Sequence, residues 1–128
     1  MTELSPVATM MGPSAPFEKK VTTVGRVGPM TEIKLIDEHG KTVPRGESGE
    51  VCVRGYLAMK EYWDEPEKTA EAKDANGWMH SGDLGKLDED GYLQLVGRLK
   101  DLIIRGGENI SPKEIEEVYG SNELVRDV

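Results

Sequence analysis

The chain has 128 residues, a formal net charge of −8, 37% hydrophobic residues and one cysteine. This length fits one modest domain or a piece of a larger protein, and the hydrophobic content is too high for a disordered chain. The negative charge argues against a nucleic-acid or anionic-membrane surface, because both require a field of opposite sign. A single cysteine excludes an internal disulfide and a zinc site built from cysteines. No apolar run approaches the length of a transmembrane segment.

The first 20 residues show little hydrophobic periodicity. They contain three prolines together with Gly12 and Ser14, and we expect them to form a loop. Chain ends fray unless other contacts hold them. We therefore expect residues 1–3 to be disordered.

Residues 21–99 are expected to form a small, mainly β, antiparallel unit that resembles a barrel. Short apolar stretches alternate there with turn signals, which is typical of strands joined by hairpins. The dipeptide Asp90-Gly91 favours positive φ and so predicts a tight turn between two of these strands. The expected strands cover residues 31–36, 50–54, 84–87 and 92–96, and a helix covers about 65–73.

A second helix is predicted close to the C-terminal end, after a short strand at residues 101–105. Ser111 fits the N-cap, Pro112 fits the first helical position, and Glu114 has the spacing of a capping box. One strand and one helix do not make a stable domain. We therefore expect residues 100–128 to be the beginning of a larger unit.

Four stretches of the chain carry sequence motifs whose order along the chain is informative. They read Met-Thr-Glu at 1–3, Gly-Trp-Met-His-Ser-Gly-Asp at 77–83, Gly-Arg-Leu-Lys-Asp at 97–101, and Arg-Gly-Gly-Glu-Asn-Ile-Ser-Pro-Lys-Glu-Ile-Glu at 105–116. In this order they resemble the superfamily of adenylate-forming enzymes, which contains acyl-CoA synthetases, luciferases and peptide-synthetase adenylation domains. The first is similar to the end of the family's Tyr-Gly-x-Thr-Glu motif, and the second to its Trp-x-x-Thr-Gly-Asp. The last two stretches are the most specific.

The resemblance also implies an architecture. Residues 1–20 would be a loop from the AMP-binding core, residues 21–99 a β-barrel-like subdomain of the AMP-binding domain, and residues 100–128 the hinge and the start of the C-terminal lid. The stretch Gly-Gly-Glu-Asn-Ile-Ser-Pro at 106–112 is similar to medium-chain fatty acyl-CoA ligases. Luciferases and coumarate-type ligases usually carry Lys-Gly-x-Gln-Val at this place, and peptide-synthetase domains usually carry Arg-Gly-x-Arg-Ile.

The reaction that the resemblance implies has two steps. A carboxylic acid attacks the α-phosphate of ATP and forms an acyl-adenylate, and the thiol of coenzyme A then displaces AMP. The substrates and cofactors would be the acid, ATP, magnesium and coenzyme A.

Two residues are candidates for holding the nucleotide. A carboxylate only accepts hydrogen bonds, so Asp83 would accept them from both ribose hydroxyls. The planar guanidinium of Arg98 would bind ribose or phosphate. The alternatives are a plain turn aspartate and a surface arginine paired with Asp101.

Further roles follow from the resemblance alone. Thr2 would donate a hydrogen bond to the α-phosphate, and Glu3 would ligate magnesium together with phosphate oxygens and water. Lys100 would be the hinge at which the lid turns, although an exposed turn lysine would carry the same letter.

Coenzyme A would pass the loop that contains Gly106, Gly107 and Glu108. Glycines allow a close approach of the backbone to a ligand, and we expect this loop to line the pantetheine tunnel. The alternative is that the two glycines shape the turn between strand and helix.

Several other residues invite interpretation. Cys52 lies in an apolar run and is expected to be a buried core thiol. His80 has no evident partner for a catalytic triad or a metal site, so we expect it only to line the site. Trp63, Trp78 and Tyr62 are expected to pack in the core or against loops.

Two family features are not found in the chain. One is the Ser/Thr/Gly-rich phosphate loop, expected before Met1, and the other is a lysine of the lid, expected after Val128. Because binding and orienting three substrates is most of this catalysis, we expect the chain alone not to turn over. The alternative function is a non-catalytic nucleotide-binding or interaction module derived from such an enzyme. Acyl chain length, compartment and oligomeric state stay open.

Overall fold

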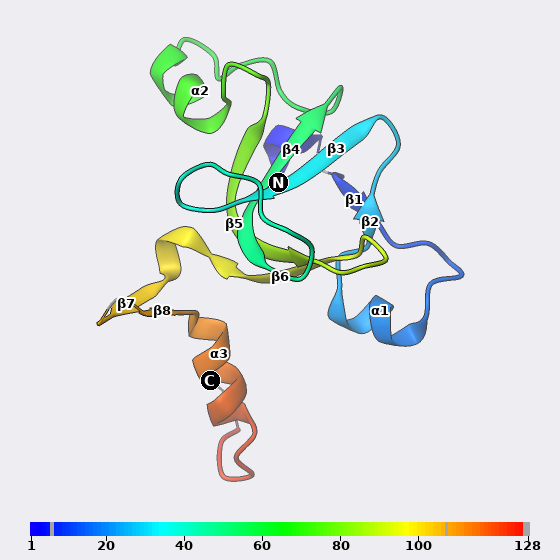
Figure 1. The fold of residues 1–128 in the computed structure, drawn as a ribbon, viewed down its shortest axis with the longest axis vertical. Helices are drawn as coiled ribbons and strands as arrows, with labels where there is room; N and C mark the ends of the chain where they lie inside the picture. Colours follow the sequence, from blue (N-terminus) through cyan, green and yellow to red (C-terminus); the bar gives the residue numbers. More distant parts are fainter. Residues whose placement is uncertain (6, 107, 127–128) are drawn as a thin grey trace.

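The computed structural model describes residues 1–5, 7–106 and 108–126. Its main element is a four-stranded antiparallel sheet with the order β3-β4-β5-β6 (Figure 1). The strands are β3 (Thr31–Ile36), β4 (Ser48–Gly55), β5 (Met79–Leu87) and β6 (Leu93–Arg98). The predicted antiparallel, mainly β class is confirmed. The sheet is open within the described residues, with β3 and β6 at its edges, and it does not close into a barrel.

Shorter elements flank the sheet. Before it come η1 (Thr2–Leu4), β1 (Thr9–Met10), α1 (Phe17–Thr22) and β2 (Arg26–Val27), and β1 pairs with β2. The helix α2 (Pro66–Ala72) lies between β4 and β5, and η2 (Leu99–Asp101), β7 (Ile103–Arg105), β8 (Glu108–Ile110) and α3 (Pro112–Gly120) follow β6. Figure 1 shows the β7–β8 hairpin and α3 extending away from the sheet. In the described part of the chain, every helix is too short or too polar to cross a bilayer.

The core lies on one face of the four-stranded sheet. Side chains alternate between the faces of a strand, so the apolar residues at every second position gather on one side. Leu35, Val51, Val53 and Met79 are each at most 4% exposed and belong to one cluster. The opposite face carries Glu50 and His80 of the candidate site together with the buried Ile36 and Cys52.

The N-terminal segment is held against this core. Leu4 is 3% exposed within the core cluster, and the Ser5 hydroxyl donates to the Leu57 carbonyl at 2.9 Å. Residues 1–3, which we expected to be disordered, therefore lie in and next to η1. The expectation of a loop over residues 1–20 also differs from the structure, which contains η1, β1 and the start of α1 there.

Turn and helix signals in the sequence have their expected counterparts. Gly91 has φ of +81° in the turn between β5 and β6, where Leu87 pairs with Leu93. The last helix begins at Pro112 as predicted. The Ser111 hydroxyl, however, donates to the Val96 carbonyl at 2.9 Å, which joins the start of α3 to β6.

The aromatic residues behave differently from one another. Two cationic groups lie over the Trp78 ring: Lys34 Nζ is 4.5 Å and Arg54 Cζ 4.6 Å from its centroid. Tyr62 is half-buried. Trp63 is 92% exposed, so the prediction that it packs in the structure is wrong.

A truncation in the core should be costly. Met79 is fully buried, so Met79→Ala removes apolar contacts and leaves a cavity. We expect the free energy of unfolding to fall by about 2–5 kcal/mol in urea denaturation followed by circular dichroism. The matched control is Met30→Ala, at a residue that is 84% exposed, with an expected change within about 0.5 kcal/mol. Equal losses in the two variants would contradict this placement of the core.

Candidate functional site

A register irregularity between β4 and β5 lies at the second of the sequence motifs. Between the partner pairs Cys52–His80 and Glu50–Leu84, one residue of β4 faces the three residues 81–83 of β5. Such a bulge leaves backbone groups unpaired and changes the direction of the strand. The motif residues therefore form a bend in β5 instead of a regular strand.

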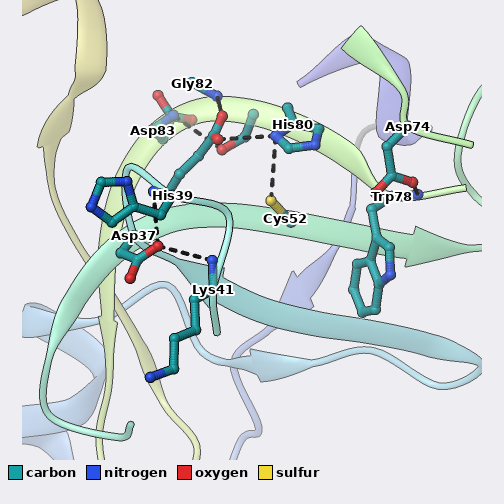
Figure 2. Close-up of polar contacts among 11 residues, drawn as sticks. Asp37, His39, Lys41, Cys52, Asp74, Trp78, His80, Gly82 and Asp83 are labelled. Atoms are coloured by element: carbon teal, nitrogen blue, oxygen red, sulfur yellow. Dashed lines mark hydrogen bonds and ion pairs between the residues drawn. The ribbon is translucent and has the colours of Figure 1, made fainter. Parts of the chain in front are cut away.

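Hydrogen bonds from side chains hold this bulge (Figure 2). Gly82 has φ of +71°, in the left-handed region that favours glycine. Its N–H donates to Glu50 Oε1 at 3.1 Å, and the Asp83 N–H donates to Ser81 Oγ at 3.0 Å. Backbone donors that the bulge takes out of the strand ladder are thus satisfied by side chains.

Asp83 and Arg98 face each other across β5 and β6. Their Cα atoms are register partners, and Arg98 Nε donates to Asp83 Oδ1 at 3.1 Å. The side chain of Asp83 is 28% exposed and that of Arg98 is 59% exposed. An ion pair with this exposure contributes only about 0–1 kcal/mol to stability. The partner of Arg98 is Asp83, not Asp101 as in the alternative that we considered from the sequence.

This pair retains hydrogen-bonding capacity. Among the described side chains, Nε and Oδ1 are the atoms that the interaction uses, so Asp83 Oδ2 and the terminal guanidinium nitrogens of Arg98 have no partner there. A carboxylate accepts at both oxygens, and a guanidinium donates in a planar fork. The arrangement can therefore accept bonds from hydroxyl groups and donate to an anionic oxygen. Its role in nucleotide binding stays a prediction.

A second group of side chains lies beside the bulge. His80 Nδ1 is 3.0 Å from Glu50 Oε2 and 3.6 Å from Cys52 Sγ (Figure 2). The expectation that His80 lacks such partners is wrong, because Cys52 stands opposite it in the strand pairing. One ligand atom from each of the three residues lies within 4.8 Å of the others, as a metal site requires.

The cysteine of this group is buried, as expected from the sequence. Cys52 is 0% exposed, and burial raises the pKa of its thiol to about 12. The thiol is therefore protonated at neutral pH, whereas metal ligation and nucleophilic attack both need the thiolate. In the free protein, the polar interaction of this group is the one between Glu50 and His80.

A cavity of about 1020 Å³ lies against the sheet face that carries Glu50 and His80. Leu99, Leu102 and Ser111 line it from the segment around η2 and the start of α3. Neither Asp83 nor Arg98 is among the lining residues. The cavity therefore reaches Glu50 and His80 and not the ion pair between β5 and β6.

Thr2 and Glu3 lie in η1. Glu3 Oε1 accepts a hydrogen bond from the Tyr62 hydroxyl at 2.8 Å, and the Glu3 carbonyl accepts one from the Met59 N–H at 2.8 Å. Its own backbone N–H and the Tyr62 hydroxyl lower the pKa of the Glu3 carboxyl. Glu3 is therefore ionised at neutral pH, as a magnesium ligand must be. Among the described residues, no hydrogen bond joins it to Asp83.

The other predicted site residues follow β6. Lys100 lies exposed in η2, where the chain passes to β7. Gly106 has φ of +62° in the turn between β7 and β8, a hairpin that the sequence did not predict. Gly107 lies outside the described residues, and Glu108 is described only by its backbone at the start of β8. The turn-shaping role of Gly106 agrees with this geometry, while the hinge and the coenzyme A tunnel stay predictions.

Comparisons with known proteins match the chain to AMP-binding enzymes, among them acyl-CoA synthetases and ligases. The family model of AMP-binding enzymes matches residues 1–63. The putative acyl-CoA synthetase YngI of Bacillus subtilis (strain 168) is 46% identical over 128 residues, covering 99% of this chain and 23% of that protein. The mitochondrial medium-chain acyl-CoA ligase ACSF2 of Homo sapiens is 43% identical, covering 99% of this chain and 21% of that protein.

A solved structure shows the same fold. It is o-succinylbenzoate CoA synthetase (MenE) from Bacillus subtilis in complex with the acyl-adenylate intermediate OSB-AMP. The TM-score is 0.84 at 38% identity, and the match covers 99% of this chain and 26% of that one. The chain thus spans about a fifth to a quarter of the length of the proteins to which it is similar.

The buried thiol should be unreactive. With the pKa of Cys52 raised to about 12, the folded chain at pH 8 holds far less thiolate than the unfolded chain, whose thiol has a pKa of about 8.5. We expect Ellman's reagent to react with the native chain at least about 100-fold more slowly than with the chain unfolded in urea. Similar rates in the two states would contradict the burial of this cysteine.

Proposed function

Because the chain belongs to the AMP-binding family of adenylate-forming enzymes, which includes acyl-CoA synthetases, we propose that it is part of a fatty acyl-CoA ligase. That ligase would activate a carboxylic acid of the medium-chain type with ATP and transfer the acyl group to coenzyme A. The chain spans about a fifth to a quarter of its relatives, so the reaction is assigned to the longer protein. The contribution of this segment would be to hold the nucleotide.

The observation that carries the proposal is the pair Asp83–Arg98 at the end of the glycine bulge. The free carboxylate capacity of Asp83 suits the two neighbouring hydroxyls of a ribose, which donate hydrogen bonds. The terminal nitrogens of Arg98 suit a ribose or phosphate oxygen beside it. Both side chains would act on one sugar-phosphate.

In the proposed reaction, a carboxylate oxygen of the acid attacks the α-phosphorus of ATP, and the bond from this phosphorus to pyrophosphate breaks. The sulfur of coenzyme A then attacks the acyl carbon, and the bond from this carbon to AMP breaks. Asp83 and Arg98 would keep the ribose still in both steps, which fixes the position of the α-phosphate.

The remaining residues have proposed roles with weaker support. Magnesium would bind at the ionised Glu3, whose carboxylate oxygens fit this ion, and Thr2 would donate to the α-phosphate. Bound magnesium would neutralise phosphate charge. The exposed Lys100 would serve as the lid hinge. The loop that contains Gly106, Gly107 and Glu108 would line the coenzyme A tunnel.

A second candidate function is a non-catalytic nucleotide-binding or interaction module. The specific observation in its favour is the exposure of large side chains: Phe17 is 79%, Tyr56 80% and Trp63 92% exposed. Exposed apolar residues mark contact surfaces when they gather in a patch. Nucleotide titration separates the two proposals, because an interaction module without a nucleotide site would fold and bind no AMP.

Nucleotide binding should depend on the Asp83 carboxylate. Asp83→Asn keeps the shape but exchanges one acceptor oxygen for an NH2 group, to which a ribose hydroxyl cannot donate. We expect the Kd for AMP, measured by isothermal titration calorimetry, to rise by about tenfold or more. The control is Glu32→Gln, which alters a carboxylate of the same sheet that pairs with Arg54 in an exposed ion pair. Unchanged affinity in Asp83→Asn would refute the site.

The chain on its own should not complete the first step. It spans about a fifth to a quarter of its relatives, and the reaction requires three substrates to be held together. We expect no release of pyrophosphate from ATP and magnesium with octanoate or decanoate, in a coupled assay with the Asp83→Asn variant as background. Release above that background would contradict the expectation.

A further inference from the structure

We propose that Glu50 is a positioning residue for the nucleotide, because its carboxylate holds the bulge at residues 81–83 and thereby sets the direction of Asp83. This inference rests on the proposed function, in which Asp83 accepts hydrogen bonds from the ribose. Glu50 itself acts through the bulge and needs no contact with the nucleotide.

The first support is that both carboxylate oxygens of Glu50 are used. Oε1 accepts from the Gly82 N–H at 3.1 Å, and Oε2 lies 3.0 Å from His80 Nδ1 (Figure 2). The side chain of Glu50 is only 16% exposed, so water competes little for these bonds. Because both oxygens are bonded, the carboxylate is held in one orientation. This orientation keeps Oε1 in place as the acceptor of the Gly82 N–H.

The second support is that packing does not fix the turn at Gly82. A Cβ built on Gly82 would find no atom within 4 Å beyond its chain neighbours, so no side chain packs against that side of the turn. No packing contact there holds the left-handed φ of +71°. The bond from the backbone N–H to Glu50 is the one that links this turn to another strand.

The third support is the position of Glu50 in the register. Its Cα partner is Leu84, the residue directly after the bulge. From this position the glutamate side chain reaches back over the bulge to Gly82, while Asp83 lies between the two contact points. A change in the Gly82 turn is thus passed to Asp83 by the backbone.

His80 supports the glutamate from the other side. Its Nδ1 is within hydrogen-bond distance of Glu50 and lies 3.6 Å from the buried Cys52 Sγ. The imidazole thus holds the second oxygen of Glu50 next to the sheet. This arrangement gives a use to His80, which the proposed chemistry does not otherwise employ.

The test compares AMP affinity in Glu50→Ala, Glu50→Gln and the control Glu32→Ala. Removing both acceptors in Glu50→Ala should raise the Kd by about tenfold. Glu50→Gln should lose clearly less, because its amide oxygen can still accept from the Gly82 N–H. Glu32 belongs to an exposed ion pair of the same sheet, so Glu32→Ala should bind AMP like the wild type.

A double-mutant cycle separates positioning from general structure. If Glu50 acts through Asp83, Glu50→Ala should cost no further affinity in the Asp83→Asn background, while its effect on unfolding should be the same in both backgrounds. Amide exchange followed by NMR provides a readout without nucleotide. The Gly82 amide of folded Glu50→Gln should exchange no more than a few-fold faster than in the wild type, and that of Glu50→Ala about tenfold faster.

The outcomes are distinguishable. Wild-type affinity in Glu50→Ala, together with weakened binding in Asp83→Asn, would overturn this inference and leave the proposed function intact. An equal loss from Glu50→Ala in both backgrounds would also overturn it. Unchanged affinity in Asp83→Asn would overturn the proposed function itself. Should Glu50→Ala not fold, Glu50→Met takes its place, because it keeps the length of the side chain and removes both acceptor oxygens; wild-type affinity for AMP in that variant would sink the inference.

Discussion

The candidate site depends on one bend in β5, and hydrogen bonds hold this bend more than packing does. Gly82 takes a left-handed conformation in open surroundings, and its N–H is bonded to the Glu50 carboxylate of the neighbouring strand. Asp83 follows directly and meets Arg98 across the next strand pair. Contacts among β4, β5 and β6 therefore set the direction of the Asp83 side chain, which we propose binds the nucleotide.

The apolar core and the side chains of Glu50 and His80 lie on opposite faces of the sheet. One face buries the apolar cluster around Val53 and Met79, and the N-terminal segment adds Leu4 to it. The other face carries Glu50 and His80, beside a cavity that the segment after β6 covers in part. If the lid turns at η2 as proposed, the bond between Ser111 and the Val96 carbonyl belongs to one pose of that motion.

Local signals in the sequence predicted the elements better than their interactions. Alternation predicted the strand at residues 31–36 with the bounds that β3 has, and Pro112 marked the start of α3. The register jump beside Gly82 is a property of two strands together, so no single stretch shows it. The partners of His80 were missed for the same reason, and the order of residues 1–3 depends on burial of Leu4 in a distant core.

The most direct test of the account is a crystal structure of the chain with AMP bound. The account predicts the ribose hydroxyls within about 3 Å of the Asp83 carboxylate oxygens, Arg98 beside the same sugar-phosphate, and Glu50 still bonded to the Gly82 N–H. AMP bound elsewhere, with Asp83 bonded to nothing but Arg98, would contradict it.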